Sequence, residues 1–506
     1  NTWLLYGGTL AERDDLPGAR RAYAEAEARD PKLLRALFGR CLTLPMVPGS
    51  ATELATARAG YVDGLAHVEA QLPARAAGMA PDALVDELRW TNFLLAYQGE
   101  DDRELQQRFA MATARAVDAA DPALRPPRPR RDRGGGRLRV GFVSAFFRDG
   151  TVGRYFERWI TDLPRADFEV FVYHLQPGMD EVATRLKARA DRFHALPRFR
   201  PTQVAAHVRE AALDALVYPE LGMDGTTFAL AGLRLAPLQC AGWGHPVTTG
   251  HPTIDVFFTV AAMEPHGAQD HYAEKLVPLP GIGTRYARPA VPARKSREAL
   301  GLPADGALLS CPQSLFKITP DDDALFARVL AAAPGSRLML FEGRHPALTR
   351  RYLARLDAAL ATAGVSRGDR VVVLPEFTAQ VSLHAQVVER MDIARDGQRH
   401  GPHGGAPERI GGQQRRQRVD LFEVLADRER LRHDATVVLE CRHQALRVQR
   451  EVGGTALLAA ITQQVARHRF IGEPLHRERD AHAISSRAAP IGVEPQRHVP
   501  PPPPGL

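Results

Sequence analysis

Lysine is rare in this chain, and one lysine stands where an anion would bind. Only five of the 66 basic residues are Lys. Lys317 lies between an expected strand, Ala307–Cys311, and an expected helix that Thr319 would cap and Pro320 would begin. The carboxyl end of a parallel strand beside a helix N-terminus is where α/β folds hold anionic ligands. A lysine ammonium is a compact charge suited to a phosphate, so we predict an anion site here.

Three further side chains with acid–base chemistry follow expected strands. Glu220 and Asp224 occur in "VYPELGMDGTTFAL", and His245 occurs in "GWGHPVTTGH", which also holds Thr248. A carboxylate or an imidazole in a loop after a strand can orient a sugar or accept a proton from a hydroxyl. The same residues can equally be helix caps or satisfied loop residues, and the spacing leaves both interpretations open.

The elements that position these residues fall into an alternating pattern. Short apolar runs alternate with amphipathic stretches such as "MDEVATRLKARADRF" and "PDDDALFARVLAAA", which is typical of parallel sheets covered on both faces. A break near "PGIGTRYARPAVPARKSREALGLP" indicates two such lobes with a ligand cleft between them. The expected strands are Leu138–Val143, Phe168–Leu175, Leu213–Tyr218, Ile254–Val260, Ala307–Cys311, Arg337–Phe341 and Arg370–Leu374.

The chain as a whole divides into five parts. We expect a helical, tetratricopeptide-like region at 1–120, a Pro-, Arg- and Gly-rich linker at 121–136, a first Rossmann-like lobe at 137–285, the start of a second at 286–380, and an atypical tail at 381–506.

The N-terminal segment matches the register of one tetratricopeptide repeat, a helical hairpin of 34 residues. Small residues let the two helices approach, an aromatic ring fills the gap, and Asp-Pro ends the second helix. An unrelated amphipathic hairpin is the alternative. The matching residues are Trp3, Gly7, Leu10, Ala19, Tyr23, Ala26 and Pro31.

The tail departs from the rest of the sequence. Residues 381–506 hold nine of the 18 His and no Lys, include "RHGPHGGAPERIGGQQRRQR", and end in a proline run. We interpret this tail as sequence read out of frame or as a disordered segment, so that the second lobe is incomplete. A divergent C-terminal lobe is the competing interpretation.

The composition argues against several classes of binding partner, among them nucleic acids, membranes and structural metal ions. The net charge of +7 comes from Arg interspersed with 59 acids, which is typical of a mixed-sign surface and not of a nucleic-acid partner. No apolar run is long enough to span a membrane. The four Cys lie far apart, which predicts a reducing cytoplasm and neither a disulfide framework nor a structural metal site.

Three segments together resemble the catalytic region of the O-linked N-acetylglucosamine transferases, in particular the bacterial SPINDLY-like branch. They are "RLRVGFVSAFFRDGTVGRYF", "LRLAPLQCAGWGHPVTTGHPTIDVFF" and "SCPQSLFKITPDDDALFARVL". The resemblance covers about residues 1–380. It implies tetratricopeptide repeats followed by a two-lobed GT-B glycosyltransferase.

The resemblance also implies a reaction and a site. The family transfers a sugar from a UDP-sugar to Ser or Thr hydroxyls of a protein, with inversion, without a metal and with no cofactor besides the donor. In the family the residue matching Lys317 contacts the donor diphosphate, and the residues matching Gln313 and Ser314 help to hold the donor. Catalytic roles for Lys317, Asp224 and His245, and sugar or acceptor contacts for Glu220 and Thr248, complete the expected site. The helical repeats would bind the protein acceptor.

Two departures from the family pattern keep a second function open. Gly150 and Thr151 stand in the loop where active family members carry a His. No Gly-Asn-Thr-like nucleotide loop follows residue 380, and "GGTALLAA" is only a faint echo of one. A non-catalytic tetratricopeptide scaffold on a degenerate transferase lobe is therefore the alternative to an active glycosyltransferase.

Overall fold

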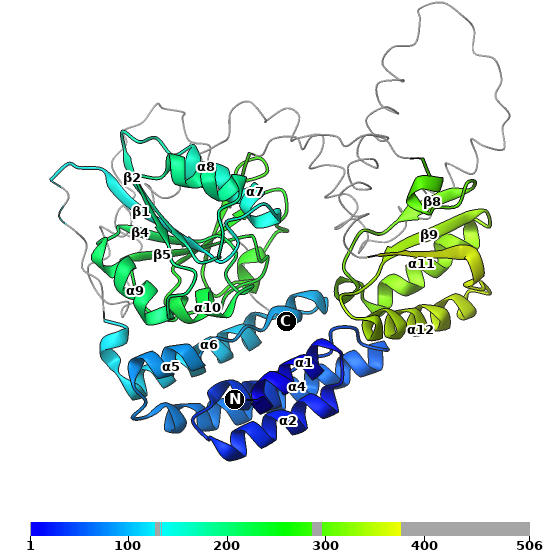
Figure 1. Cartoon of the computed structure of the whole chain (residues 1–506), viewed down its shortest axis with the longest axis horizontal. Coiled ribbons are helices and arrows are strands. Elements are labelled where there is room, and N and C mark those ends of the chain that lie inside the picture. Colours follow the sequence, from blue (N-terminus) through cyan, green and yellow to red (C-terminus); the bar gives the residue numbers. More distant parts are fainter. Residues whose placement is uncertain (1, 127–131, 133, 286–295, 376–506) are drawn as a thin grey trace, which may run out of the picture.

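The computed structural model describes residues 2–126, 132, 134–285 and 296–375, which form a helical region and two α/β lobes (Figure 1). The predicted tail at 381–506 lies outside the described residues. No helix in the described part of the chain combines the length and the apolar character that crossing a lipid bilayer requires. The helical region comprises α1 (Thr2–Glu12), α2 (Leu16–Arg29), α3 (Leu34–Leu42), α4 (Ala51–Ala76), α5 (Pro81–Glu87), η1 (Phe93–Tyr97), α6 (Arg103–Ala120) and η2 (Pro122–Leu124).

The first helices pack around one buried tyrosine. A Cβ atom at Gly7 would lie 2.7 Å from a ring carbon of Tyr23, and one at Gly39 would lie 2.6 Å from the opposite side of the ring. Helix α2 ends at Arg29, and Asp30 is its C-cap. The hairpin predicted from the small residues and Tyr23 is therefore present, and α3 adds a third wall that the repeat register did not include. The tetratricopeptide assignment itself stays a prediction.

The first lobe is built on a seven-stranded parallel sheet in the order β3-β2-β1-β4-β5-β6-β7. The order reverses between β1 and β4, which makes their carboxyl ends the switch point where doubly wound folds bind ligands. The strands are β1 (Leu138–Ser144), β2 (Phe168–His174), β3 (Arg192–Ala195), β4 (Ala215–Tyr218), β5 (Leu238–Gly242), β6 (Val256–Val260) and β7 (Lys275–Leu279). Between them lie α7 (Thr151–Thr161), α8 (Glu181–Arg189), α9 (Pro201–Glu210), α10 (Gly225–Ala231) and η3 (Ala268–His271).

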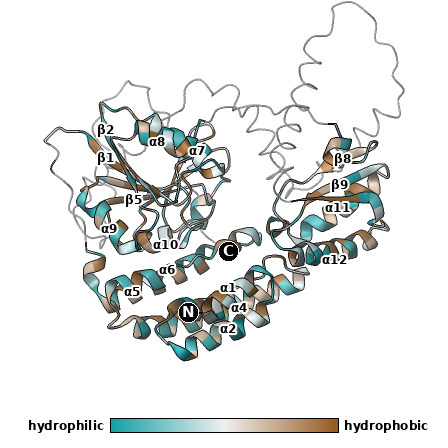
Figure 2. Cartoon of the chain, in the orientation of Figure 1, coloured by the Kyte–Doolittle hydropathy of each residue, from teal (hydrophilic) through white to brown (hydrophobic). Residues whose placement is uncertain are grey.

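Burial explains which of these strands the apolar pattern predicts. Strands β1, β2, β4 and β6 are almost completely buried, and each was expected from a continuous apolar run. The edge strands β3 and β7 are partly exposed and carry polar residues or a proline, so that no such run marks them. Strand β5 is buried but short, and its sequence Leu-Gln-Cys-Ala-Gly places a glutamine in the core. In Figure 2 the strands of the sheet are mostly brown, which marks hydrophobic residues, whereas the helices that cover the sheet are partly teal, which marks hydrophilic residues.

The described part of the second lobe has a three-stranded parallel sheet in the order β10-β9-β8. All three of its strands were predicted from their apolar runs. The elements are η4 (Glu298–Leu300), β8 (Ala307–Ser310), η5 (Leu315–Lys317), α11 (Pro320–Ala332), β9 (Ser336–Phe341), α12 (Pro346–Thr362), η6 (Gly368–Arg370) and β10 (Val371–Leu374). Helical and parallel α/β parts thus occur in the predicted order.

The helical region packs against both lobes (Figure 1). The ring of Phe109 on α6 contacts Phe38 of α3 at 5.5 Å and Phe228 of the first lobe at 5.6 Å between centroids. Val47, between α3 and α4, is fully buried in the core of the second lobe. The helical region therefore holds the two lobes in position through these contacts.

Candidate functional site

Lys317 lies in a short turn that leads from β8 into α11. It ends η5, and its backbone N–H donates to the Ser314 carbonyl at 2.9 Å. Thr319 caps α11 in a reciprocal capping box with Asp322, and Pro320 is the first helical residue. The predicted strand–loop–helix is confirmed. A lysine is thereby fixed at the carboxyl edge of the second sheet.

The Lys317 ammonium rests on two aromatic rings. Its Nζ lies 5.4 Å from the ring centroid of Tyr97 and 5.9 Å from that of Phe316, within the range of cation–π attraction. The side chain as a whole remains exposed. The rings nevertheless exclude water from part of it, and this desolvation lowers the pKa of Lys317. The ammonium is held at the surface instead of moving freely in solvent.

His245 lies deep beside the same rings. It is 2% exposed and stacks on Phe93, with 5.5 Å between ring centroids and 18° between planes. Neither ring nitrogen has a hydrogen-bond partner in the part of the chain that the structure describes. Burial, aided by the charge of Lys317, lowers the pKa of His245 to about 4. His245 is therefore a neutral imidazole at physiological pH, with two free nitrogens.

One aromatic cluster brings all three parts of the chain together. The Phe316 centroid lies 5.7 Å from that of Phe93 and 5.0 Å from that of Tyr97. Phe93 and Tyr97 come from the helical region, His245 from the first lobe, and Phe316 and Lys317 from the second. This cluster is the candidate active site, because it joins a cation and a neutral base across the two lobes.

Sequence reasoning missed the contribution of the helical region to this cluster. Phe93 and Tyr97 stand four residues apart in a segment expected only to continue the helical pattern. Both rings lie in η1, and their centroids are 5.0 Å apart. Aromatic pairs at this spacing usually serve a core, so the pattern by itself did not indicate a site.

A buried acid lies at the switch point of the first sheet. Ser144 ends β1 and donates from its hydroxyl to Glu220, just after β4, at 2.8 Å. Glu220 is 1% exposed, and its second carboxylate oxygen has no hydrogen-bond partner within the described residues. Burial raises the pKa of Glu220 to about 8, with the Ser144 hydrogen bond opposing. Glu220 is accordingly protonated at neutral pH, and Ser144 is a partner that sequence reasoning did not identify.

Asp224 and Thr248 have structural partners. The Asp224 carboxylate caps α10 by accepting the N–H groups of Thr226 and Thr227, both at 2.9 Å. The Thr248 hydroxyl donates to the buried Glu274 at 2.6 Å. The helix-cap alternative weighed for Asp224 is the one that the geometry shows. The chemical roles expected of Asp224 and Thr248 stay predictions.

The predicted donor contacts Gln313 and Ser314 are exposed residues of the same loop as Lys317. Their side chains stand open to solvent at the edge of the second lobe. Both side chains are accessible to a ligand, and their expected role in binding the donor stays a prediction.

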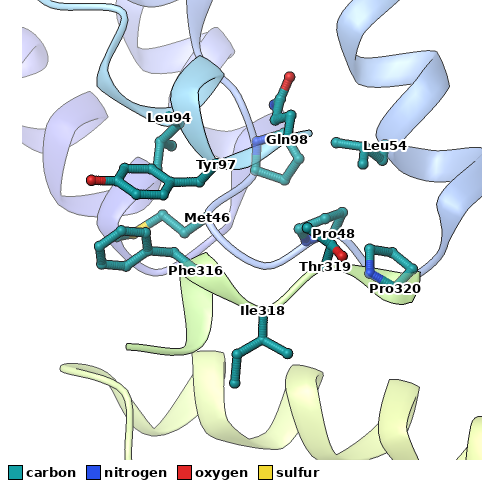
Figure 3. A pocket seen from close by; sticks show the side chains of 11 residues that line it. Met46, Pro48, Leu54, Leu94, Tyr97, Gln98, Phe316, Ile318, Thr319 and Pro320 are labelled. Carbon is teal, nitrogen blue, oxygen red and sulfur yellow. The ribbon is translucent and has the colours of Figure 1, made fainter. Parts of the chain in front are cut away.

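An apolar pocket lies next to the cluster, between the helical region and the second lobe. Figure 3 shows Tyr97 and Leu94 of η1 above Phe316, with the loop that carries Met46 and Pro48 between them. The pocket walls are Pro45, Met46, Pro48, Leu54, Leu94, Tyr97, Gln98, Phe316, Ile318, Thr319 and Pro320.

Comparison with known proteins finds relatives of the first lobe. A family model described as Glycosyl transferase family 41 matches residues 121–284. A tomato (Solanum lycopersicum) protein named probable UDP-N-acetylglucosamine–peptide N-acetylglucosaminyltransferase SPINDLY is 28% identical over 207 residues, which is 40% of this chain and 22% of the relative. An Arabidopsis thaliana protein with the same enzyme name and the designation SEC is 26% identical over 43% of this chain and 23% of its own length. The matched stretch thus spans about a fifth of these curated relatives.

A solved structure extends the likeness in fold. A mutant O-GlcNAc transferase of Thermobaculum terrenum superposes with a TM-score of 0.51 at 21% identity, over 92% of this chain and 96% of that one. This supports the predicted GT-B arrangement of the two lobes. Residues 121–284 therefore match the model of glycosyltransferase family 41, in a chain whose fold is similar to that of an O-GlcNAc transferase.

Proposed function

We propose that the chain is an inverting, metal-independent protein O-glycosyltransferase that moves N-acetylglucosamine, or a related hexose, from a UDP-sugar to Ser or Thr hydroxyls. One observation carries the proposal. Lys317 of the second lobe and His245 of the first meet at one aromatic cluster, closely enough for the charge of one to lower the pKa of the other. Sugar transfer needs such a pair, a cation for the leaving diphosphate and a base for the incoming hydroxyl.

Lys317 supplies the charge for the departing diphosphate. Helix α11 contributes little to that task, because three acids occupy its first turn and Asp322 already accepts from Thr319. The anion expected at this helix start therefore depends mainly on the ammonium. Partial desolvation by Tyr97 and Phe316 strengthens the attraction between the ammonium and a phosphate.

His245 is our candidate for the base. A neutral imidazole with free nitrogens can accept a hydroxyl proton, yet a pKa of about 4 makes it a weak acceptor. A diphosphate bound to Lys317 would offset the ammonium charge, which is the smaller of the two causes that lower the pKa of His245, and would make the imidazole a somewhat better proton acceptor. Because His245 is almost fully buried, the acceptor reaches it only when the residues around it move aside.

Glu220 is our candidate for a contact to the sugar or the acceptor. Its protonated carboxyl group has one oxygen without a partner and lies at the switch point of the sheet. A neutral carboxyl group can donate a hydrogen bond that a carboxylate cannot. We further propose that protein acceptors approach along the helical region, whose η1 borders the site. The expectation of a cytoplasmic location stays a prediction.

A sugar-transfer assay on the full chain tests the proposal. Purified protein is incubated with radiolabelled UDP-N-acetylglucosamine and a Ser/Thr-rich protein acceptor, and UDP binding is followed by calorimetry. We expect UDP binding and label on the acceptor that β-elimination releases.

The scaffold alternative makes the opposite prediction. It is favoured by the missing His in the loop at 147–154 and by the missing nucleotide loop after residue 380. Intact folding without UDP binding or transfer would support the scaffold and refute the enzyme.

A further inference from the structure

Arg355 on α12 is a buried arginine that links three separate segments. It is 7% exposed, and its guanidinium pairs with Asp323 of α11 through Nε. One Nη donates to the carbonyl of Ile318 at 2.7 Å, and the other donates to the carbonyl of Pro48 in the helical region at 2.7 Å. The guanidinium also lies 5.1 Å from the ring centroid of Tyr352. A rigid fork of donors lets one side chain satisfy all of these acceptors at once.

The Ile318 contact acts on the backbone next to Lys317. On one side the Lys317 N–H is bound to the Ser314 carbonyl, and on the other side Arg355 holds the carbonyl of the next residue. The loop is therefore fixed on both sides of the lysine. Because the third donor of Arg355 reaches Pro48, the same side chain ties this loop to the helical region.

A neighbouring arginine provides a natural comparison. Arg351, one helical turn earlier on α12, donates to the Val47 carbonyl at 2.5 Å and pairs with Glu53 and Asp14. It binds the same segment of the helical region. None of its contacts in the described chain reaches the loop at 313–319.

We propose that Arg355, held by Asp323, is a positioning residue for Lys317. The inference rests on the proposed function, in which Lys317 binds the donor diphosphate. Arg355 touches no substrate. Its effect passes through the loop backbone, since a small shift of that backbone moves the ammonium away from the phosphate.

A binding cycle tests this inference. Four full-length proteins are compared for UDP binding by ligand-observed NMR, which measures millimolar dissociation constants: the unaltered chain, Lys317→Met, Arg355→Met with Asp323→Leu, and all three changes together. Removing both members of the ion pair avoids leaving an unpaired buried charge. Arg351→Met is the matched control, because it loosens the same interdomain contact without touching the loop.

The expected result is non-additivity. The paired change should raise the dissociation constant of UDP about tenfold in the unaltered chain and leave it unchanged once Lys317 is Met. Arg351→Met should change it less than twofold. Equal loss in both backgrounds would overturn the positioning role, as would a full loss from Arg351→Met.

Two further outcomes keep the test decisive. If the paired variant fails to unfold cooperatively, Arg355→Lys goes through the same cycle, since lysine keeps the charge but lacks the fork that bridges three acceptors. If the unaltered folded chain does not bind UDP, the proposed function fails and this inference fails with it. If UDP binds but the cycle is additive, only the inference fails.

Discussion

The two lobes bring opposite kinds of chemistry to one place. The first lobe supplies Glu220 and His245, which are both almost fully buried. Burial raises the pKa of Glu220 and lowers that of His245, so that it favours the neutral form of each side chain. The second supplies Lys317, which is exposed and positively charged and rests on aromatic rings. Under the proposed function, proton transfer therefore depends on packing in the first lobe, whereas stabilisation of the leaving charge depends on the loop that carries Lys317.

The sheets reflect the same contrast. In the first lobe, the site follows the middle of a seven-stranded sheet, where neighbours cover β1 and β4 on both sides. In the described part of the second lobe, the Lys317 loop follows an edge strand of the three-stranded sheet and gains support from α12 and the helical region. Activity that depends on Glu220 and His245 should therefore respond to changes in packing and pH. Activity that depends on Lys317 should respond to the removal of single polar contacts.

Loss of the Lys317 charge should give the largest effect. Replacing Lys317 by Met should lower turnover by about a hundredfold to a thousandfold, the scale seen when one preorganised charge-stabilising donor is removed. The unfolding midpoint should stay unchanged, because the side chain is exposed. Steady-state sugar transfer and urea unfolding measure the two. Lys187→Met on α8 is the control. Normal turnover in Lys317→Met would remove the lysine from the site.

Crowding His245 should mainly affect stability. Gly222 has a φ of +110°, and a Cβ there would lie 2.5 Å from Cδ2 of His245. Gly222→Ala should therefore lower the free energy of unfolding by about 3 kcal/mol, from backbone strain and overpacking together.

Gly178→Ala separates these two causes. Gly178 also has a positive φ, +87°, but nothing lies within 4 Å of the added carbon. It should cost only about 1 kcal/mol. Equal losses in the two variants, measured by urea unfolding, would mean that the imidazole is not tightly packed.

The buried acid should make stability depend on pH. The pKa of Glu220 is about 8 in the folded chain, against the ordinary glutamate value of 4.5 in the unfolded chain, so the folded form holds a proton that the unfolded form releases. Stability therefore falls as pH rises toward 8. The histidines with lowered pKa values act in the opposite direction, but only below 6.5. Between pH 6.5 and 8 the loss from Glu220 should be about 2 kcal/mol.

Glu220→Gln tests this prediction, because the amide keeps the shape and cannot ionise. Urea unfolding at several pH values should show a flatter profile for the variant between pH 6.5 and 8. Parallel profiles for the two proteins would show that Glu220 is already ionised in the folded chain.

The smallest effect should separate a cap from a catalyst. Asp224→Asn keeps an oxygen that can accept from Thr226 and Thr227 but removes the charge. The free energy of unfolding should therefore change by only a few tenths of a kcal/mol, and turnover should change less than twofold. Asp224→Ala should cost about 1 kcal/mol through the lost cap. A large fall in turnover for Asp224→Asn, with stability kept, would support the catalytic role expected from the sequence.

Local sequence determined the framework. Continuous apolar runs predicted seven of the ten described strands, because a strand covered on both faces needs apolar residues at every position. Thr319 and Pro320 marked the start of α11, because capping depends on adjacent residues. Lys317 was identifiable as a rare cation in such a loop. Strands β3 and β7 escaped prediction because polar residues or a proline interrupt them, and β5 escaped because it is short and holds a glutamine.

Tertiary structure decided what the individual side chains do. Glu220 and Asp224 look alike in sequence, yet one is a buried acid against Ser144, 76 positions earlier, and the other caps the helix that follows it. Phe93 and Tyr97 joined the site, and Arg355 joined the Lys317 loop, through contacts with distant segments. Local patterns fix how the backbone folds. A side chain's pKa, partners and reach depend on which distant residues displace water from it, and only the folded chain brings those residues together.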